Sequence, residues 1–246
     1  MSLDLLAIGP HPDDVELFCG GVIIRAVEQG RSVGILDLTR GEAATRGTPE
    51  QRAEEARDAA RILGVAVREN LGLPDLGLGG TRPDQIDAVA SAIRRLRPAV
   101  VLGPPPRARH PDHEAGSAMV RAAVFKANVA GWRSDAPRHR VERLGAYVMR
   151  FALTPSLIVD TSGTRARKRR AIEAYASQFG SDGLQTLLSS AGAIEAVEAR
   201  DAYMGAQIGA ETGEPLLFDG VFGASDLFSA LEVLRGSGFF WEAGTP

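Results

Sequence analysis

Cysteine is almost missing from this chain: Cys19 is the only one among 246 residues. An internal disulfide is therefore excluded, and with it the class of small domains that depend on disulfides. The chain also lacks an apolar run near the roughly 20 residues that a membrane span requires, and its first residues, MSLDLLAIG, lack the basic start of a signal peptide. We therefore expect a cytoplasmic protein with no membrane partner.

A large excess of charge of either sign is missing as well. The 28 basic and 31 acidic residues leave a net charge of −3, which gives no general attraction for nucleic acid or anionic membranes. The basic run RARKRR (165–170) has no interleaved aromatic residues, so we interpret it as a solvated helix face rather than a nucleic-acid site. Because no linker or internal repeat divides the sequence, we expect residues 1–246 to form a single domain.

The first half of the chain alternates between strand and helix patterns. Buried strands are indicated by short apolar runs at 3–9, 32–38, 67–73 and 99–103. Helices are indicated between them at 14–29, 49–63 and 82–97. This alternation is typical of βαβ units. It predicts an α/β fold of the Rossmann-like, doubly wound kind, with a mostly parallel sheet and helices on both faces.

The second half has a less regular pattern, which should complete the sheet and cover one side of a site. We expect strands at 147–153 and 156–160 and helices at 164–179 and 192–209. Between the halves lies a basic loop at 131–145, including His139, which could act as a lid over an acidic substrate. The apolar segment 221–234 is interpreted as either a subunit interface or core.

Two polar clusters follow predicted strands. His-Pro-Asp-Asp (11–14) comes directly after the first strand, and His-Pro-Asp-His (110–113) comes after the fourth. In open parallel sheets, ligands bind beyond the carboxyl ends of the strands, where the strand order reverses. If the first and fourth strands are sheet neighbours, both clusters face one crevice at their C-terminal ends.

Three side chains of these clusters form a pattern that suits a metal ion: His11, Asp14 and His113. Catalytic zinc sites commonly use three nitrogen or oxygen ligands and leave a fourth position for water. Iron, cobalt or manganese would also fit such ligands. The sequence therefore predicts one divalent ion, zinc in the first instance.

The remaining polar residues of the clusters suit hydrolysis. Asp13 would lie beside the attacking water and act as a general base. His110, if protonated, could stabilise an oxyanion, with Asp112 orienting it and favouring its charged form.

A structural interpretation of the clusters is also open. Acidic residues are favoured at helix N-termini, so either cluster alone could be a helix cap, and the chain would then be a non-catalytic Rossmann-like binding protein. A two-metal phosphoesterase is disfavoured, because only Asp112 is left as a further ligand. Two clusters at equivalent strand ends favour the metal site.

At these residues the chain resembles the PIG-L/LmbE-like family of zinc-dependent N-acetylglucosamine deacetylases. Extended through Glu16, the first cluster fits the family pattern His-Pro-Asp-Asp-x-Glu, and the segments TRGE (39–42), LPD (73–75) and RHPDH (109–113) also have counterparts. The resemblance implies a Rossmann-like fold, one zinc per subunit and a homo-oligomer. It also implies the ligand, base and stabilising roles given above for the two clusters.

Within this family the chain most resembles the bacillithiol-biosynthesis branch, which deacetylates N-acetylglucosaminyl L-malate. The features that carry this resemblance are RHPDH, AYASQF (174–179) and the segment 195–215. The alternatives are the same deacetylation of a mycothiol-type precursor, a chitobiose or a glycolipid, or amidase activity on a thiol conjugate. They stay open because specificity would lie in the loops at 40–48, 74–82 and 131–145.

Four further residues are candidates for contacts with an N-acetyl sugar substrate. Arg52 could bind a hydroxyl or carboxylate, or else pair with Glu54 or Glu55 on its own helix. Arg109 could hold the malate carboxylate, or be a solvated loop residue.

Asp75 and Glu42 could accept hydrogen bonds from sugar hydroxyls. The alternative for Asp75 is an ordinary turn. The alternatives for Glu42 are support of a neighbouring site residue or a plain loop acid. A glycine pair, Gly20-Gly21, lies in the first helix without a phosphate-binding motif, so we expect it to allow close packing of helix on sheet.

Overall fold

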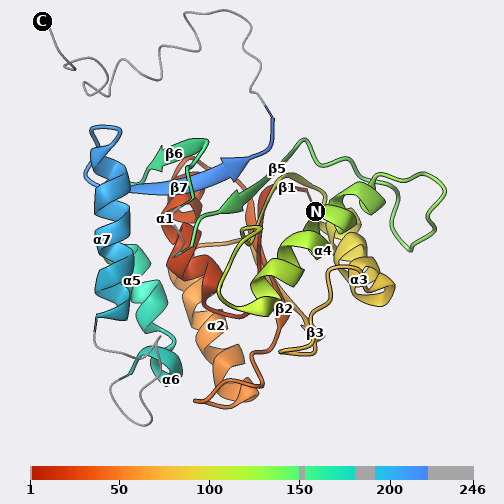
Figure 1. Ribbon diagram of the computed structural model, residues 1–246, viewed down its shortest axis with the longest axis horizontal. Coiled ribbons are helices and arrows are strands. Elements are labelled where there is room, and N and C mark those ends of the chain that lie inside the picture. The colour runs from red at the N-terminus through yellow and green to blue at the C-terminus, as the bar shows by residue number, and fades with distance from the viewer. Residues whose placement is uncertain (1, 150–152, 181–191, 221–246) are drawn as a thin grey trace, which may run out of the picture.

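The computed structural model describes residues 2–149, 153–180 and 192–220 (Figure 1). Within these ranges seven strands form one sheet in the order β3-β2-β1-β4-β5-β7-β6. The strands are β1 (Leu3–Gly9), β2 (Val33–Thr39), β3 (Val67–Leu73), β4 (Pro98–Gly103), β5 (Arg143–Tyr147), β6 (Leu157–Asp160) and β7 (Gly213–Phe218). The pairings of β1 to β5 are parallel, whereas β7 pairs antiparallel with β5 and β6. The predicted α/β fold with a mostly parallel sheet is confirmed.

The strand order reverses between β1 and β4, which are direct neighbours. Leu5 pairs with Val100 and Ala7 with Leu102, so the two strands end at the same edge of the sheet. The two polar clusters that follow them therefore face a common crevice, as the sequence predicted.

Helices cover both faces of the sheet (Figure 1). They are α1 (Asp14–Glu28), α2 (Pro49–Leu63), α3 (Pro83–Leu96), α4 (Pro111–Ala127), α5 (Arg165–Glu173), α6 (Ala176–Phe179) and α7 (Ala193–Ala206). Helices α1, α2, α5 and α7 share one apolar core with Leu5 and Ala7 of β1. Helices α3 and α4 share the other core with Leu6 and Ile8, because successive side chains of a strand point to opposite faces.

Local sequence explains the helix boundaries that hold α2 in place. Thr48 accepts a hydrogen bond from the Gln51 main chain and the Gln51 side chain accepts one from Thr48, which forms a capping box before Pro49. Gly64 ends the helix at φ 76°, a left-handed conformation that suits glycine. The observed bounds of α2 and β3 match the predicted ranges 49–63 and 67–73.

Several predictions for the second half are wrong. The strand predicted at 147–153 lies instead at Arg143–Tyr147, where β5 pairs with β4; residues 150–152 are outside the described part. The helix predicted at 164–179 is interrupted at Tyr175 (ψ 61°), whose side chain is buried. Strand β7 was not among the predicted strands. Pairing with β5 and β6 makes it a strand.

The basic loop at 131–145 does not lie over the site, so its interpretation as a lid is wrong. The His139 ring donates a hydrogen bond to the Pro98 carbonyl at 2.7 Å, and its main-chain N–H donates to Ala127. Pro98 begins β4 and Ala127 ends α4, so both anchors lie at the opposite edge of the sheet from the polar clusters. The segment 221–234 lies outside the described residues. Among the described helices, none combines the length and apolarity needed to cross a membrane.

Candidate active site

The first cluster forms a sharp turn between β1 and α1. Asp13 occupies the N-cap position of α1 at φ 115°, a conformation that is rare and strained for a residue other than glycine. Its side chain makes no capping hydrogen bond, so the structural interpretation of this aspartate as a helix cap is wrong. The carboxylate turns instead towards Arg52 of α2.

Asp13 and Arg52 form a buried ion pair. The guanidinium donates to Asp13 Oδ2 at 2.9 Å and also to the Pro12 carbonyl, while both side chains are about 5 % exposed or less. The alternative pairing of Arg52 with Glu54 or Glu55 does not form: Glu54 lies near Arg57, and Glu55 accepts hydrogen bonds from Ser177. Burial raises the pKa of Asp13 to about 7, against the attraction of Arg52 and with a further contribution from the neighbouring Asp14.

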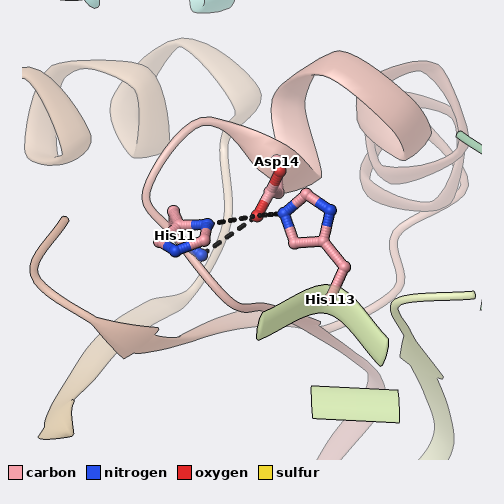
Figure 2. A group of neighbouring side chains, drawn as sticks. All are labelled: His11, Asp14 and His113. Atoms are coloured by element: carbon pink, nitrogen blue, oxygen red, sulfur yellow. Dashed lines mark hydrogen bonds and ion pairs between the residues drawn. The ribbon is translucent and has the colours of Figure 1, made fainter. Parts of the chain in front are cut away.

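Asp14 lies between two histidines, one from each cluster (Figure 2). Its Oδ2 is 3.4 Å from His11 Nδ1 and 3.1 Å from His113 Nε2, and it also accepts the main-chain N–H of His11 at 3.0 Å. Burial alone would raise the pKa of Asp14, but His113 and His11 hold it well below its usual range. The three ligand atoms lie within 4.8 Å of one another, so the predicted ligands do converge.

The opposite side of the His11 ring faces two further acids. Its Nε2 is 3.0 Å from Asp75 Oδ1 and 3.5 Å from Asp112 Oδ2. Asp75 also accepts the Ala43 main-chain N–H, and these hydrogen bonds outweigh its burial and lower its pKa to about 2. The two nitrogens of His11 therefore face different carboxylates, Asp14 on one side and Asp75 with Asp112 on the other.

The contacts of His110 differ from those predicted. Its Nδ1 accepts the main-chain N–H of Asp112 at 3.2 Å, whereas the Asp112 carboxylate accepts the main-chain N–H groups of Leu76 and Leu78. Burial, followed by the neighbouring His11 and His113, lowers the pKa of His110 despite the attraction of Asp112. The main chain of Asp112, not its carboxylate, thus orients this ring, and the ring is not held in its charged form.

A cavity of about 380 Å³ opens over these groups. Eight of the ten residues predicted for the site line it: His11, Asp13, Asp14, Arg52, Asp75, Arg109, His110 and His113. Asp112 lies behind His11, and Glu42 accepts the main-chain N–H of Asp75 at 3.0 Å. Glu42 therefore holds a turn of the site and is not among the lining residues.

Several lining residues were not predicted, because they carry no reactive group. They are Phe18, Ala43, Ala44, Thr45, Leu76, Ala108, Met149 and Gln178. Gln178 belongs to the AYASQF segment and reaches the cavity from α6, more than a hundred residues after the first cluster. No periodicity in the sequence indicates such a contact.

A buried polar network behind the cavity was also missed. Glu16 in the first turn of α1 accepts hydrogen bonds from Arg68 of β3 and from the Tyr175 hydroxyl. Arg68 also forms a two-pronged ion pair with Asp37 of β2, at 2.8 and 2.9 Å. The network ties the helix that carries Asp13 and Asp14 to the sheet. Its sequence signal was an acid and an arginine within otherwise strand-like segments.

The basic run on α5 is used inside the protein. Lys168 is 5 % exposed and donates to Asp201 and Glu214, and Arg169 pairs with Glu198 at 2.6 Å. The interpretation of this run as a solvated helix face is therefore wrong for Lys168, which forms part of the core.

The glycine pair of α1 allows close packing, as predicted. A Cβ on Gly21 would lie 2.9 Å from Thr161 and 3.0 Å from Glu214. Here α1 is kinked at Cys19 (φ −144°, ψ 21°), and the Glu214 carboxylate accepts the N–H groups of Gly21 and Val22 at 2.9 and 2.7 Å.

Comparison with known proteins agrees with this geometry. Residues 6–124 match the PIG-L family, described as GlcNAc-PI de-N-acetylase. A diacetylchitobiose deacetylase of Thermococcus kodakarensis is 33% identical over 193 residues, which are 72% of this chain and 71% of that protein. A probable N-acetyl-alpha-D-glucosaminyl L-malate deacetylase 2 of Bacillus cereus is 32% identical over 135 residues, 50% of this chain and 61% of that protein.

A solved structure is similar to a larger share of the chain. The conserved protein TT1542 of Thermus thermophilus superposes with a TM-score of 0.84 at 42% identity, and the match covers 91% of this chain and 98% of that one. The family match and the Thermococcus kodakarensis relative confirm the resemblance to the PIG-L family and the prediction of a hydrolase. The chain belongs to the PIG-L family of de-N-acetylases.

Proposed function

We propose that this protein is a zinc-dependent deacetylase that hydrolyses the acetamide of an N-acetylglucosaminide. The observation that carries the proposal is the buried Asp13, held by Arg52 beside the His11–Asp14–His113 group at the floor of one cavity. A carboxylate next to a set of metal ligands is an arrangement that suits metal-dependent hydrolysis of an amide. Membership of a de-N-acetylase family supports the same reaction.

The metal ligands in this proposal are His11, Asp14 and His113. Two imidazole nitrogens and a carboxylate oxygen fit catalytic zinc and leave a coordination position open. Asp75 adds to this fit, because metal-binding histidines usually donate their other ring N–H to a carboxylate, and Asp75 is 3.0 Å from His11 Nε2. When bound, zinc would polarise the acetamide carbonyl and acidify the attacking water.

Asp13 is the proposed general base. Its carboxylate takes a proton from the attacking water and returns it to the glucosamine nitrogen as the amide bond breaks. Arg52 fixes the carboxylate through Oδ2, at 2.9 Å, so that the base keeps one orientation. The left-handed backbone at Asp13 also helps to orient the carboxylate, because it turns the side chain away from α1 and towards the cavity.

His110 is the proposed donor to the oxyanion. Because its Nδ1 accepts the Asp112 N–H, the ring proton lies on Nε2. An Nε2–H can donate to the acetamide oxygen as negative charge develops there, and no positive charge on the ring is needed. His110 thus keeps the predicted stabilising role, but as a hydrogen-bond donor rather than an imidazolium.

For the substrate we propose N-acetylglucosaminyl L-malate. Arg109 is exposed, lines the cavity and makes no hydrogen bond or ion pair with any other described residue, so its guanidinium is free to bind the malate carboxylate. Similarity to the probable malate-conjugate deacetylase of Bacillus cereus supports this choice. Diacetylchitobiose is the second candidate, because the Thermococcus kodakarensis relative matches a larger share of the chain.

The test is release of free amine by zinc-loaded protein from four compounds: N-acetylglucosaminyl malate, diacetylchitobiose, an N-acetylglucosaminyl inositol and N-acetylglucosamine. Asp13→Asn should lower turnover by about 10²–10⁴-fold while zinc content stays the same. Arg109→Ala should raise KM for the malate compound alone, whereas Arg107→Ala, a neighbouring exposed arginine outside the cavity, should not. A preference for chitobiose would overturn the malate assignment, and full activity of Asp13→Asn would overturn the mechanism.

A further inference from the structure

Leu76 has an unusual backbone conformation for its residue type. It is the third residue of the turn Pro74-Asp75-Leu76-Gly77, in which the Gly77 N–H donates to the Pro74 carbonyl at 3.1 Å. Leu76 has φ 59°, and Asp75 before it is not in the positive-φ region. That combination marks a type II turn, whose third position normally holds glycine or asparagine. A leucine there is strained.

Packing within the protein does not explain this leucine. Leu76 is 65 % exposed, among the most exposed large apolar residues of the described chain. Its main chain, in contrast, is tightly held, because the Leu76 N–H donates to Asp112 Oδ2 at 2.7 Å and to Asp75 Oδ1 at 2.9 Å. Both acids also lie against His11 Nε2, so the turn is fixed directly to the proposed metal group.

The side chain of Leu76 lines the cavity together with other apolar groups, among them Phe18, Ala108 and Met149. The lining of the cavity therefore combines apolar residues with histidines and carboxylates. A pyranose ring matches such a cavity, since its hydroxyls need polar partners and its C–H face needs apolar contact.

We propose that Leu76 is a specificity-determining residue that packs against the apolar face of the glucosamine ring of the substrate. The proposal rests on the proposed function and adds to it: Leu76 contributes to binding of the sugar and not to the chemical step. The strained turn adds a large, exposed apolar residue to the cavity lining, where glycine would offer no side chain.

The test uses Leu76→Asn and Leu76→Gly, because both residues tolerate the left-handed region and the turn should therefore be kept. We expect Tm to be unchanged or raised, KM for N-acetylglucosaminides to rise about tenfold, and kcat to stay within about twofold. The matched control is Arg97→Gly, which removes a positive φ (50°) at the exposed end of α3, far from the cavity. It should leave KM unchanged.

Calorimetric titration with N-acetylglucosamine separates this inference from the proposed function. A wild-type protein that deacetylates the sugars, with unchanged KM and affinity in both Leu76 variants, would overturn the inference and leave the function. A wild-type protein without turnover whose sugar affinity falls in Leu76→Asn would support the inference and overturn the function. Absence of sugar binding to the wild type, or a loss confined to kcat, would overturn the role given to Leu76.

Discussion

Replacing Gly41 with alanine should damage the site without touching any reactive group. Gly41 lies in the TRGE segment at φ 67°, and a Cβ added there would collide with Arg52 Nη1 and lie 2.8 Å from Arg52 Cζ. Real Cβ atoms do not approach so closely, so the guanidinium must move. The guanidinium cannot move far without breaking its hydrogen bond to Asp13, in which Arg52 Nη2 is 2.9 Å from Asp13 Oδ2.

The magnitude follows from two separate costs. Placing alanine in a left-handed conformation costs about 1–2 kcal/mol. Breaking a buried ion pair by displacing one partner costs about 3–5 kcal/mol. If the displacement breaks the pair only in part, a total near 4 kcal/mol corresponds to a fall in Tm of roughly 8–16 °C for a chain of this size. Misplacement of Asp13 should lower kcat about 100-fold.

Gly72→Ala is the matched control. Gly72 is exposed on β3 at φ 61°, and a Cβ there meets nothing within 4 Å. This variant carries the backbone strain alone, so Tm should fall by only about 2–8 °C and kcat should stay unchanged. Thermal unfolding and amine release, measured on both variants, separate the effect of backbone strain from the effect of displacing Arg52. Equal behaviour of Gly41→Ala and Gly72→Ala would refute the reasoning.

Other changes test the surroundings of the site. Asp75→Asn removes the charge facing His11 Nε2 and should weaken zinc binding about 10–100-fold in competition with a chromophoric chelator; unchanged affinity would show that Asp75 does not support the metal. Removing metal with a chelator should abolish turnover and lower Tm, both restored by added zinc, whereas a chelator-resistant activity would exclude metal-dependent hydrolysis. Burial alone would raise the pKa of Glu214, but the ammonium of Lys168, 2.6 Å away, and its hydrogen bond act in the opposite direction, and the pKa lies below its usual range. The stabilisation that the ionised Glu214 gives the fold is thus present above the pKa of glutamate in the unfolded chain, about 4.3. It is lost as pH falls through the lower pKa that Glu214 has in the folded protein. Glu214→Gln should lose about 3 kcal/mol at pH 7, and in denaturant titrations its stability should approach that of the wild type as pH falls through the folded pKa of Glu214. A constant difference at all pH values would argue against the ion pair.

The first half of the fold was predictable because each of its elements is marked locally. Thr48 and Pro49 begin α2 and Gly64 ends it. The strands β1 and β2 are mostly apolar runs in which every residue but Asp4 is buried. The convergence of the two clusters followed from one topological rule for parallel sheets. The second half was harder, since β7 is a strand only through its antiparallel partners β5 and β6.

The partners of the charged residues could not be predicted in the same way. Arg52 was expected to pair within its own helix or to reach substrate, yet its partner Asp13 is 39 residues away. Lys168 was interpreted as solvated, yet it meets Glu214 across 46 residues of sequence. A charge pattern along a helix shows only its neighbours one turn away. Ion pairs that connect different elements depend on the packing of the whole fold.

Main-chain N–H groups are the partners of two acids near the site, Glu42 and Asp112. For Glu42 the sequence left open a sugar contact, support of a site residue or a plain loop acid, and its carboxylate accepts the N–H of Asp75. Asp112 was expected to orient His110, but its carboxylate accepts the N–H groups of Leu76 and Leu78. Every residue except proline carries such a donor, so the sequence does not show which one a loop carboxylate will meet. Here those hydrogen bonds fix the turn that brings Asp75 to His11. An acid near a group of metal ligands can therefore support that group without contacting substrate or metal. It does so by holding the main chain of the residues that make those contacts.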